Sequence, residues 1–511
     1  MAISGKVAIS VPDEAIEKSF SIALDLVAEM RRVAFAHYGY DGWFATSNGK
    51  TQPEPRYDLR DFRYYPKCAA FLWGDHPSLL QEMGKRIFFD QHDGDGRLTW
   101  DPRGQCGIHV AQTAKHFSDY LRYAEQDAFV RDNWSRLMNI VKWALSAYDR
   151  DSDGLIEHGG QVPTRLWGLL VGEPYNGFDW DRTQDDVVVV ASMEMCELLQ
   201  LLADYAKTHG LPEAERLRSR GEQSRDAIER LAWDSDADYY YLVRRTAENR
   251  WYHSGGGINE DSRELDVTPY YAALVSGNDG RGRKVAEYAR RVLMDLGVFP
   301  TPLIYPFYFW GKYEPGRFIP GGCFEESYYN CVRAFARYGM RDAVFTAINR
   351  RSDAHVRDKD CLEWYMPDGT IQGHSRDRYG ISAGAHISAI IEGLFGIVPA
   401  RFGFDEVNIQ PAIPDAWADR PATISVLLPN SGFLKYTYRI GEAGRTLHLT
   451  LETDKKRLGN FRIPVAGCAK RVTWNGEPIP YDVSPDSDAG RQIVSFSRLF
   501  EKTVLEIGAD F

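Results

Sequence analysis

The chain has 511 residues, of which 44% are hydrophobic and 26% are charged, a composition typical of globular proteins. This length exceeds one ordinary core, so we expect one large domain with an appendage, or two to three domains. The formal net charge of -11 argues against a nucleic acid or an anionic membrane as partner, because both are bound through basic surfaces. We find neither a secretion signal nor an apolar stretch long enough to cross a bilayer, which predicts a cytoplasmic protein.

The residue types that bind metals or cofactors do not occur in the usual patterns. The seven cysteines are scattered without a CxxC pair, and the histidines show no HExxH spacing, which argues against disulfide and zinc frameworks. Asp149, Asp151 and Asp153 imitate the start of a calcium-binding EF-hand loop, but Gly160 stands where a bidentate glutamate is needed. We interpret this segment as a turn and expect neither a metal nor a cofactor.

Helical periodicity begins after Pro12 and Asp13, which are typical of a helix start. The apolar residues that follow at helical spacing are Ile16, Phe20, Leu24 and Val27. Another strongly apolar run begins at Val187. Its consecutive valines could form a strand, but the uninterrupted MEMCELLQLLADYAK that follows favours a helix.

Short and long connections alternate between the twelve predicted helices. Five connections are short turns, such as GDHP and SGNDG, and six are long aromatic and polar segments, such as residues 149–186 and 234–266. Because antiparallel neighbours need only short links, this alternation predicts six helical hairpins with every long loop at one end. Six hairpins in a ring form an (α/α)6 toroid, and we expect function among the long loops at its mouth.

The pattern changes after Gly396 to short runs in which apolar and polar residues alternate, divided by Gly, Pro and Asn-Gly. Such runs are typical of an antiparallel β-sandwich. We therefore predict a mainly α fold with two domains. Residues 1–400 would form an (α/α)6-barrel catalytic domain and residues 401–511 a C-terminal β-sandwich domain.

The stretch from Cys361 to Pro399 carries the main candidate for catalysis. Glu363 lies beside Trp364 and Tyr365 and precedes a polar loop and a helix of small residues. A carboxylate among aromatic faces suits a sugar site, because the rings stack on pyranose C–H surfaces while the carboxylate activates water. The alternative is a structural glutamate that caps a helix or pairs with an arginine of the loop.

Two other long segments carry acids among aromatic residues. Arg60 and Asp61 could hold vicinal hydroxyls of one terminal sugar, or could form a salt-bridged loop. Asp179 stands between two aromatic residues, one of them Trp180, and burial there would raise its pKa as a general acid requires. Asp181 is the next candidate for the acid.

Glu325 and Glu326 begin a predicted helix at the same mouth. Capping and compensation of the helix dipole explain two glutamates in a first turn without any function. Either side chain could also bind a hydroxyl or serve as the acid.

The toroid, the RDF segment, the FDWD segment and the closing LEWY, SAGAH and EGLFGI segments together resemble the six-hairpin glycosidase superfamily. The chain looks closest to its mannosylglycerate hydrolase-like, trehalase-like and processing α-glucosidase group. The resemblance implies that Glu363 is the general base, and that Arg60 and Asp61 hold the terminal sugar. It also implies that Asp179 is the acid, although Asn176 replaces the serine of the family's Ser-Gly-(Trp or Met)-Asp motif.

On this basis we predict an inverting exo-acting glycoside hydrolase that cleaves a terminal sugar from an oligosaccharide or small glycoside. Glu363 would deprotonate water and Asp179 would protonate the leaving oxygen, with the two carboxyl groups about 6.5 to 9.5 Å apart. The substrate-binding residues would be Arg60, Asp61, Trp180, Asp181, Glu326, Trp364 and Tyr365.

A glycoside phosphorylase of the same fold and a non-catalytic carbohydrate-binding protein are the alternatives. Glu363 argues against a phosphorylase, because a carboxylate would repel phosphate. An epimerase would need paired histidines at the mouth, and a polysaccharide lyase a Tyr/His pair with basic residues; neither is apparent. We expect a small carbohydrate substrate, no nucleic acid and no membrane, and a homo-oligomer is compatible with the sequence.

Overall fold

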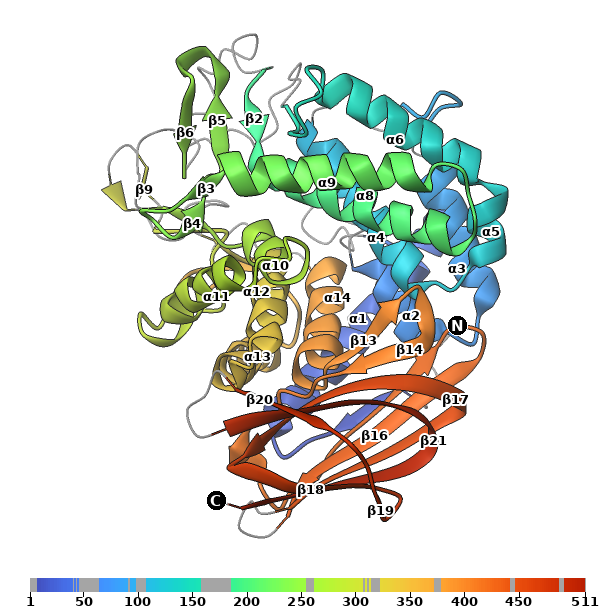
Figure 1. Ribbon diagram of the computed structural model, residues 1–511, viewed down its shortest axis with the longest axis vertical. Helices are drawn as coiled ribbons and strands as arrows, with labels where there is room; N and C mark the ends of the chain where they lie inside the picture. The colour runs from blue at the N-terminus through green and yellow to red at the C-terminus, as the bar shows by residue number, and fades with distance from the viewer. Residues whose placement is uncertain are drawn as a thin grey trace.

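The computed structural model describes residues 7–39, 41–42, 44–45, 64–90, 92–97, 107–157, 185–253, 262–306, 308–309, 312–313, 322–371, 378–441, 446–486 and 491–510. Helices form the first part of the chain and a large sheet forms the last part, which lies below the helices in Figure 1. The predicted combination of a helical toroid and a C-terminal sheet is confirmed.

Six helices form a closed inner ring, in which each helix contacts the next and the last contacts the first. In order they are α2 (Tyr65–Trp73), α4 (Gly107–Tyr123), α8 (Val189–Thr208), α10 (Val267–Leu274), α12 (Glu325–Arg337) and α14 (Gly380–Ser388). All residues of α2 are buried, which explains why its sequence YPKCAAFLW is apolar on nearly every side.

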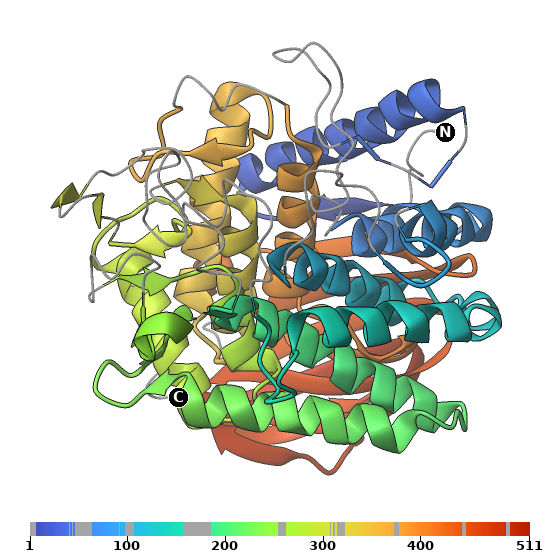
Figure 2. The same cartoon turned by 90° about the horizontal axis from the view of Figure 1, so that it is seen from above.

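Six longer or more polar helices pack outside this ring. They are α1 (Glu14–Tyr38), α3 (Pro77–Lys85), α6 (Trp134–Tyr148), α9 (Ala214–Leu231), α11 (Asp279–Met294) and α13 (Arg341–Asp358). Seen from above, α1 (blue) and α9 (green) lie on opposite sides of the helical layer (Figure 2). Shorter helical segments are η2 (Arg86–Asp90), α5 (Asp127–Asp132), η4 (Thr246–Glu248), η5 (Ala389–Leu394) and η6 (Asp415–Trp417).

The connections follow the predicted alternation. Short turns at residues 74–76, 124–126, 209–213, 275–278 and 338–340 follow the inner helices, whereas the long segments precede them. The N-termini of the inner helices therefore gather at one end of the ring, which we call the mouth. The short turns gather at the other, which we call the closed end.

Short strands lie within the long segments. They are β2 (Val187–Val188), β3 (Trp233–Asp234), β4 (Tyr239–Tyr240), β5 (Val243–Arg245), β6 (Arg250–Tyr252), β7 (Arg263–Glu264), β8 (Ile304–Tyr305), β9 (Tyr308–Phe309), β10 (Lys312–Tyr313), β11 (Cys323–Phe324) and β12 (Trp364–Tyr365). The helix predicted from Val187 begins only at Val189, because the preceding two valines pair with β5. Strand pairing with a distant segment overrides the local helical pattern there.

The large sheet contains ten strands in one hydrogen-bonded network. They are β1 (Ala8–Ser10), β13 (Ile397–Arg401), β14 (Gly403–Ile409), β15 (Ala422–Leu428), β16 (Gly432–Ile440), β17 (Thr446–Ala466), β18 (Cys468–Trp474), β19 (Glu477–Pro478), β20 (Asp482–Pro485) and β21 (Arg491–Asp510). The sheet includes β1, near the start of the chain, and β13, which crosses residue 400. The division into two domains at residue 400 therefore remains a prediction.

The two longest strands of the sheet, β17 and β21, pair with each other along most of their length. Their antiparallel register shifts between Glu452 and Arg457. Before this shift β17 pairs with β16, and after it β17 pairs in parallel with β14. The change of neighbours at the shift lets β17 pair with β16 along its first part and with β14 along its second part.

The closed end of the ring rests on the sheet. Glu125, in the turn after α4, accepts hydrogen bonds from the backbone N–H of Phe404 and from Nδ2 of Asn430, the latter at 3.1 Å. Arg341, at the start of α13, contacts Asp415 with an Nη2 to Oδ1 distance of 3.2 Å. These contacts join the closed end of the helices to β14 and to segments between strands of the sheet.

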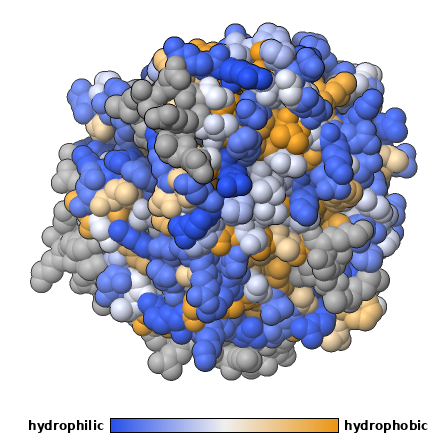
Figure 3. Space-filling view, turned by 90° about the horizontal axis from the view of Figure 1, so that it is seen from below, coloured by the Kyte–Doolittle hydropathy of each residue, from blue (hydrophilic) through white to orange (hydrophobic). Residues whose placement is uncertain are grey.

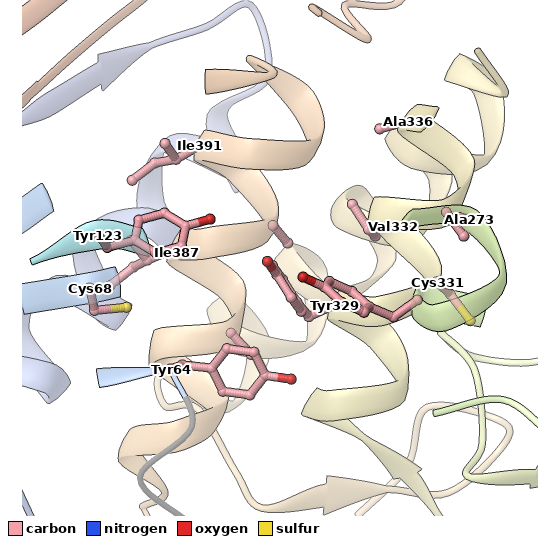
Figure 4. Packing of buried hydrophobic residues seen from close by; sticks show 14 of the residues in the cluster. Tyr64, Cys68, Tyr123, Ala273, Tyr329, Cys331, Val332, Ala336, Ile387 and Ile391 are labelled. Carbon is pink, nitrogen blue, oxygen red and sulfur yellow. The ribbon is translucent and has the colours of Figure 1, made fainter. Parts of the chain in front are cut away.

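Aromatic and aliphatic side chains of several inner helices meet inside the ring (Figure 4). Tyr64 lies just before α2, and its ring centroid is 5.0 Å from that of Tyr329 on α12. Ile387 of α14 and Val332 of α12 are buried beside them.

On the outside, the face seen from the side of the sheet is largely hydrophilic, with small apolar areas between polar ones (Figure 3). Among the helices of the described ranges, none is long and apolar enough to cross a membrane.

A pair of buried histidines ties α14 to its neighbours. His386 Nε2 lies 2.8 Å from Ser19 Oγ of α1, and its Nδ1 lies 3.1 Å from Tyr328 Oη of α12. The ring of His355 is 4.7 Å away, and both histidines are fully buried. Burial, followed by the charge of Arg351, lowers the pKa of His386 to about 3.

We expect the closed-end contact of Glu125 to contribute measurably to stability. Replacing Glu125 with Ala should lower the free energy of unfolding by about 1 to 2 kcal/mol, because it leaves the Phe404 N–H without its acceptor. Urea and thermal unfolding of the variant would measure this loss. Glu222→Ala, at an exposed position on α9, is the control and should change little; equal effects of both substitutions would refute the role of Glu125.

The buried histidines predict acid sensitivity. The pKa of His386 is about 3 in the folded state, against about 6.5 for a free histidine, so only the unfolded chain takes up a proton in this range. Its contribution is fully present above about pH 6.5 and declines by about 1.4 kcal/mol per unit as the pH falls toward the folded pKa. His386→Gln should flatten the fall in stability between about pH 6.5 and 4, whereas His37→Gln, at an exposed position, should not. An unchanged slope in His386→Gln would contradict this prediction.

Candidate functional site

The mouth presents two carboxylates from neighbouring backbone positions. Strands β11 and β12 are antiparallel, and Phe324 pairs with Trp364. The next residues outward are Glu325, the first residue of α12, and Glu363. Directly opposite residues in such a pair have Cα atoms about 4.5 to 5.5 Å apart, so this register brings the two acids close together. Glu325 is buried and Glu363 is half-buried.

A buried arginine of α13 supports this strand pair from behind. Arg351 Nη1 donates to the backbone oxygen of Cys323 in β11 at 3.3 Å, and Nη2 donates to Ser382 Oγ of α14 at 2.9 Å. Ser382 Oγ in turn donates to the backbone oxygen of Leu362 at 2.6 Å. Arg351 therefore holds β11 directly and holds the residue before Glu363 through one serine.

Arg351 is 0% exposed, yet no carboxylate of the described ranges lies within ion-pair distance of it. Instead, its guanidinium carbon lies 4.7 Å from the ring centroid of Tyr365. A buried charge without an ionic partner is costly, and its field is weakly screened. This cation therefore acts on neighbouring groups such as His386, whose pKa is lowered by burial and then by Arg351.

Tyr365 is placed differently from the prediction. Its side chain is 0% exposed and packs behind the strand, with its ring centroid 5.1 Å from that of Phe299. The sequence predicted a stacking wall for sugar, but the inward direction of a strand side chain at this position makes Tyr365 a support for Arg351.

The ring interior beneath the mouth holds a first group of buried charges around Lys67. Lys67 Nζ lies 3.3 Å from Asp119 Oδ1 and 3.9 Å from Glu392 Oε1, and donates to Tyr329 Oη at 2.9 Å. Burial alone would lower the pKa of Lys67, but these two carboxylates outweigh it and raise the pKa. Lys67 is thus a permanent cation.

A second group surrounds Glu197 of α8. Lys115 Nζ lies 2.9 Å and Arg122 Nη2 lies 3.2 Å from its oxygens, and Tyr270 Oη donates to it at 3.0 Å. Burial would raise the pKa of Glu197, but the two cations outweigh it and lower the pKa. Glu197 therefore stays ionised and is unsuited to donate a proton.

A pair of acids stands before α10. Glu264 accepts hydrogen bonds from the backbone N–H groups of Val267 at 2.8 Å and Thr268 at 2.9 Å, which caps the helix. Asp266 Oδ1 accepts from Asn330 Nδ2 at 2.8 Å. Burial, followed by the charge of Asp266, raises the pKa of Glu264, whereas its hydrogen bonds with Thr268 and Val267 oppose this rise.

A small cavity of about 20 Å³ lies between these groups, and its lining includes Tyr64, Lys115, Glu197, Tyr270 and Asn330. Such a volume holds about one water molecule. The cavity lies on the ring interior below the mouth, and its mostly apolar wall includes the charged side chains of Lys115 and Glu197.

Several residues predicted for the site lie outside the described residues: Arg60, Asp61, Asp179, Trp180 and Asp181. For Glu326 and Trp364 the structure describes only the backbone, in α12 and β12. The pairing of β11 with β12 places the backbone of Trp364 and of Glu326, two residues after β11, in the same part of the mouth as Glu363. The sugar-binding and acid roles of this set remain predictions.

The aspartates of the segment after α6 form a turn. Asp151 Oδ1 accepts from the Asp153 N–H at 3.1 Å, and Asp153 Oδ1 accepts from the Leu155 N–H at 2.8 Å. One ligand oxygen from each of these two residues and from Asp149 lies within 4.8 Å of the others. Arg220 contacts the Asp149 carboxylate and supplies positive charge there.

Sequence reasoning missed the supports beneath the mouth. Lys67 could have been found, because a single lysine inside an otherwise apolar helix signals a buried charge. Arg351 gave no such signal, because the charged run INRRSDAHVRD reads as the exposed side of an outer helix. Asp266 likewise lies in a long segment without an aromatic neighbour to mark it.

No protein-family model matches the sequence, and no curated protein matches it in sequence. Solved structures are similar in fold. A GH78 family rhamnosidase of Bacillus sp. GL1 matches with a TM-score of 0.61 and 15% identity, over 90% of this chain and 43% of that chain. The α-L-rhamnosidase from Dictyoglumus thermophilum matches with a TM-score of 0.65 and 9% identity, over 99% of this chain and 50% of that chain.

A GH63 mannosylglycerate hydrolase from Thermus thermophilus matches with a TM-score of 0.51 and 13% identity, over 73% of this chain and 99% of that chain. The chain thus spans half or less of the length of the two rhamnosidases. The hydrolase is matched over 99% of its length, by 73% of this chain. These likenesses show the fold: this chain shares a helical toroid with a β domain with both kinds of neighbour.

Arg351 should be required for stability of the mouth. Replacing Arg351 with Ala removes two hydrogen bonds and leaves a cavity, and should lower the free energy of unfolding by about 3 kcal/mol. Thermal and urea unfolding would measure this loss. Arg357→Ala, on the same helix at a side chain that is 52% exposed, should cost less than about 0.5 kcal/mol. A loss in Arg351→Ala no larger than in this control would refute the supporting role.

Proposed function

We propose that the protein is an inverting, exo-acting glycoside hydrolase with Glu363 as its general base. The observation that carries this proposal is the position of Glu363, a half-buried carboxylate beside β12 at the mouth of a six-hairpin toroid. Long loops converge on this end of the ring, as they do on the functional end of other scaffolds. The support from Arg351 holds the Glu363 backbone in one position, which a general base needs.

In the proposed reaction Glu363 removes a proton from water as the water oxygen bonds to the anomeric carbon. A second carboxylic acid, for which Asp179 is our first candidate, gives its proton to the leaving glycosidic oxygen. The bond between the anomeric carbon and that oxygen breaks, and inversion requires the two carboxyl groups to lie about 6.5 to 9.5 Å apart.

The neighbours suggest which glycosides to try first. Two are rhamnosidases and one is a mannosylglycerate hydrolase. A terminal deoxyhexose or hexose joined to a sugar or a small organic aglycone is therefore the substrate class that we propose. A phosphorylase would bind phosphate where water attacks, and the negative charge of Glu363 disfavours that anion.

We expect Glu363→Gln to lower the turnover number by about 10²- to 10⁴-fold or more while fold and sugar binding are retained, because the amide cannot accept the proton from water. Proton NMR of the chain with α-L-rhamnosides, mannosylglycerate and α- and β-linked disaccharides would follow the released sugar and its anomer. Glu222→Gln, at an exposed position of α9, should keep full activity. Full activity of Glu363→Gln would refute the assignment of the base.

Two further variants test the acid. Asp179→Asn should remove activity toward glycosides with poor leaving groups and spare those with good leaving groups, because only a poor leaving oxygen needs protonation. If Glu325→Gln shows this pattern and Asp179→Asn does not, the acid is Glu325.

The same NMR experiment tests the alternative functions. Release of a sugar phosphate in phosphate buffer, with no free sugar when phosphate is absent, would show that the protein is a phosphorylase and not a hydrolase. Unchanged glycosides that nevertheless bind would indicate a carbohydrate-binding protein.

A further inference from the structure

A second cavity lies at the closed end, between the ring and the sheet. Its volume is about 430 Å³, far more than the space of one water molecule. Its walls come from the ends of α10 and α12 and from β13, β14 and β17. It is therefore at the opposite end of the inner helices from Glu363.

The wall on the side of the sheet is polar. β14 and β17 pair in parallel with Asn408 opposite Asn460, and both residues line the cavity together with Gln410 and Arg462. Alternate residues of a strand point to one face, so a single face of this strand pair carries amides and a guanidinium. A sheet face that served only to pack against helices would be apolar.

Two of the three arginines in the lining are neutralised. Arg333 Nε lies 3.4 Å from Glu392 Oε2, and its Nη1 donates to the Glu392 backbone oxygen at 2.9 Å. Arg337 Nη2 donates to Asp279 Oδ1 at 3.1 Å. Both carboxylates belong to the same lining, so these charges cancel in pairs.

The third arginine, Arg462, has no direct partner for its charge among the described residues. Within the described ranges, Arg462 donates no hydrogen bond and has no carboxylate within ion-pair distance, and its Nε is buried. Burial, followed by repulsion from Arg337, lowers the pKa of its guanidinium, and Asp279 and Asp486 offset this only in part. The side-chain amides of Gln410 and Asn460 donate hydrogen bonds to other residues of the protein. The side-chain amide of Asn408 donates to no described residue.

We propose that this cavity binds a small molecule with an oxyanion, a carboxylate or a phosphate, through Arg462 and Asn408. A guanidinium binds both kinds of oxyanion through paired N–H groups, and such charge-assisted hydrogen bonds would supply the partners that Arg462 lacks. The cavity volume admits a molecule as large as a sugar acid or a sugar phosphate. This site is separate from the mouth, and the proposal does not depend on the glycosidase reaction.

The test uses the full chain and four probes at equal ionic strength: inorganic phosphate, glucose 6-phosphate, glucuronate and uncharged glucose. Thermal unfolding and isothermal titration calorimetry should show stabilisation and binding with at least one anion and none with glucose. Which anion binds most tightly distinguishes free phosphate, a sugar phosphate and a sugar carboxylate. Absence of binding by all three anions overturns the proposal.

Variants separate this site from unspecific binding. Arg462→Gln should weaken binding of the preferred anion by about 10- to 100-fold, because one charge-assisted contact is lost. Asn408→Asp should weaken it in the same range, since it places a like charge beside the ligand. Arg498→Gln, at an exposed position of β21, is the matched control and should bind as the parent does. Equal binding by the parent and by both cavity variants overturns the proposal.

Discussion

Closure of the inner ring is the constraint on which the other features depend. The last inner helix, α14, must lie against the first, α2, and two glycines permit the contact. A Cβ atom on Gly380 would lie 2.1 Å from Tyr65 Oη, and one on Gly384 would lie 3.0 Å from the Cβ of Tyr64. Larger side chains at these positions would force the helices apart, and the long loops would no longer converge on one mouth.

The closed ring encloses charges rather than a purely apolar core. Lys67 and Glu197 are each held by two oppositely charged side chains, and neighbouring tyrosines donate or accept further hydrogen bonds. Buried ions of this kind are tolerated only when oppositely charged side chains compensate them. The network therefore demands the accurate helix positions that closure provides, and in return it gives the ring interior a polar surface below the mouth.

The two ends of the inner helices differ in what they expose. At the mouth, Glu325 and Glu363 adjoin a short strand pair held by Arg351, whose charge has no carboxylate partner among the described residues. At the closed end, the sheet seals the short turns and leaves a polar cavity around Arg462. In both places an arginine has no ionic partner in the described part of the chain. Its positive charge can therefore stabilise a negatively charged group that lies nearby.

The sequence by itself determined the hairpins, the alternation of short and long connections, the change to strands after Gly396 and the placement of Glu363 in a mouth segment. These features are local, because periodicity and turn residues are read within a few neighbours. Only the tertiary structure decided that Arg351 holds the residue before Glu363 through Ser382, that Tyr365 is buried and that Val187 starts a strand. Such outcomes depend on partners far away in the chain, whose positions are set by ring closure and by strand pairing.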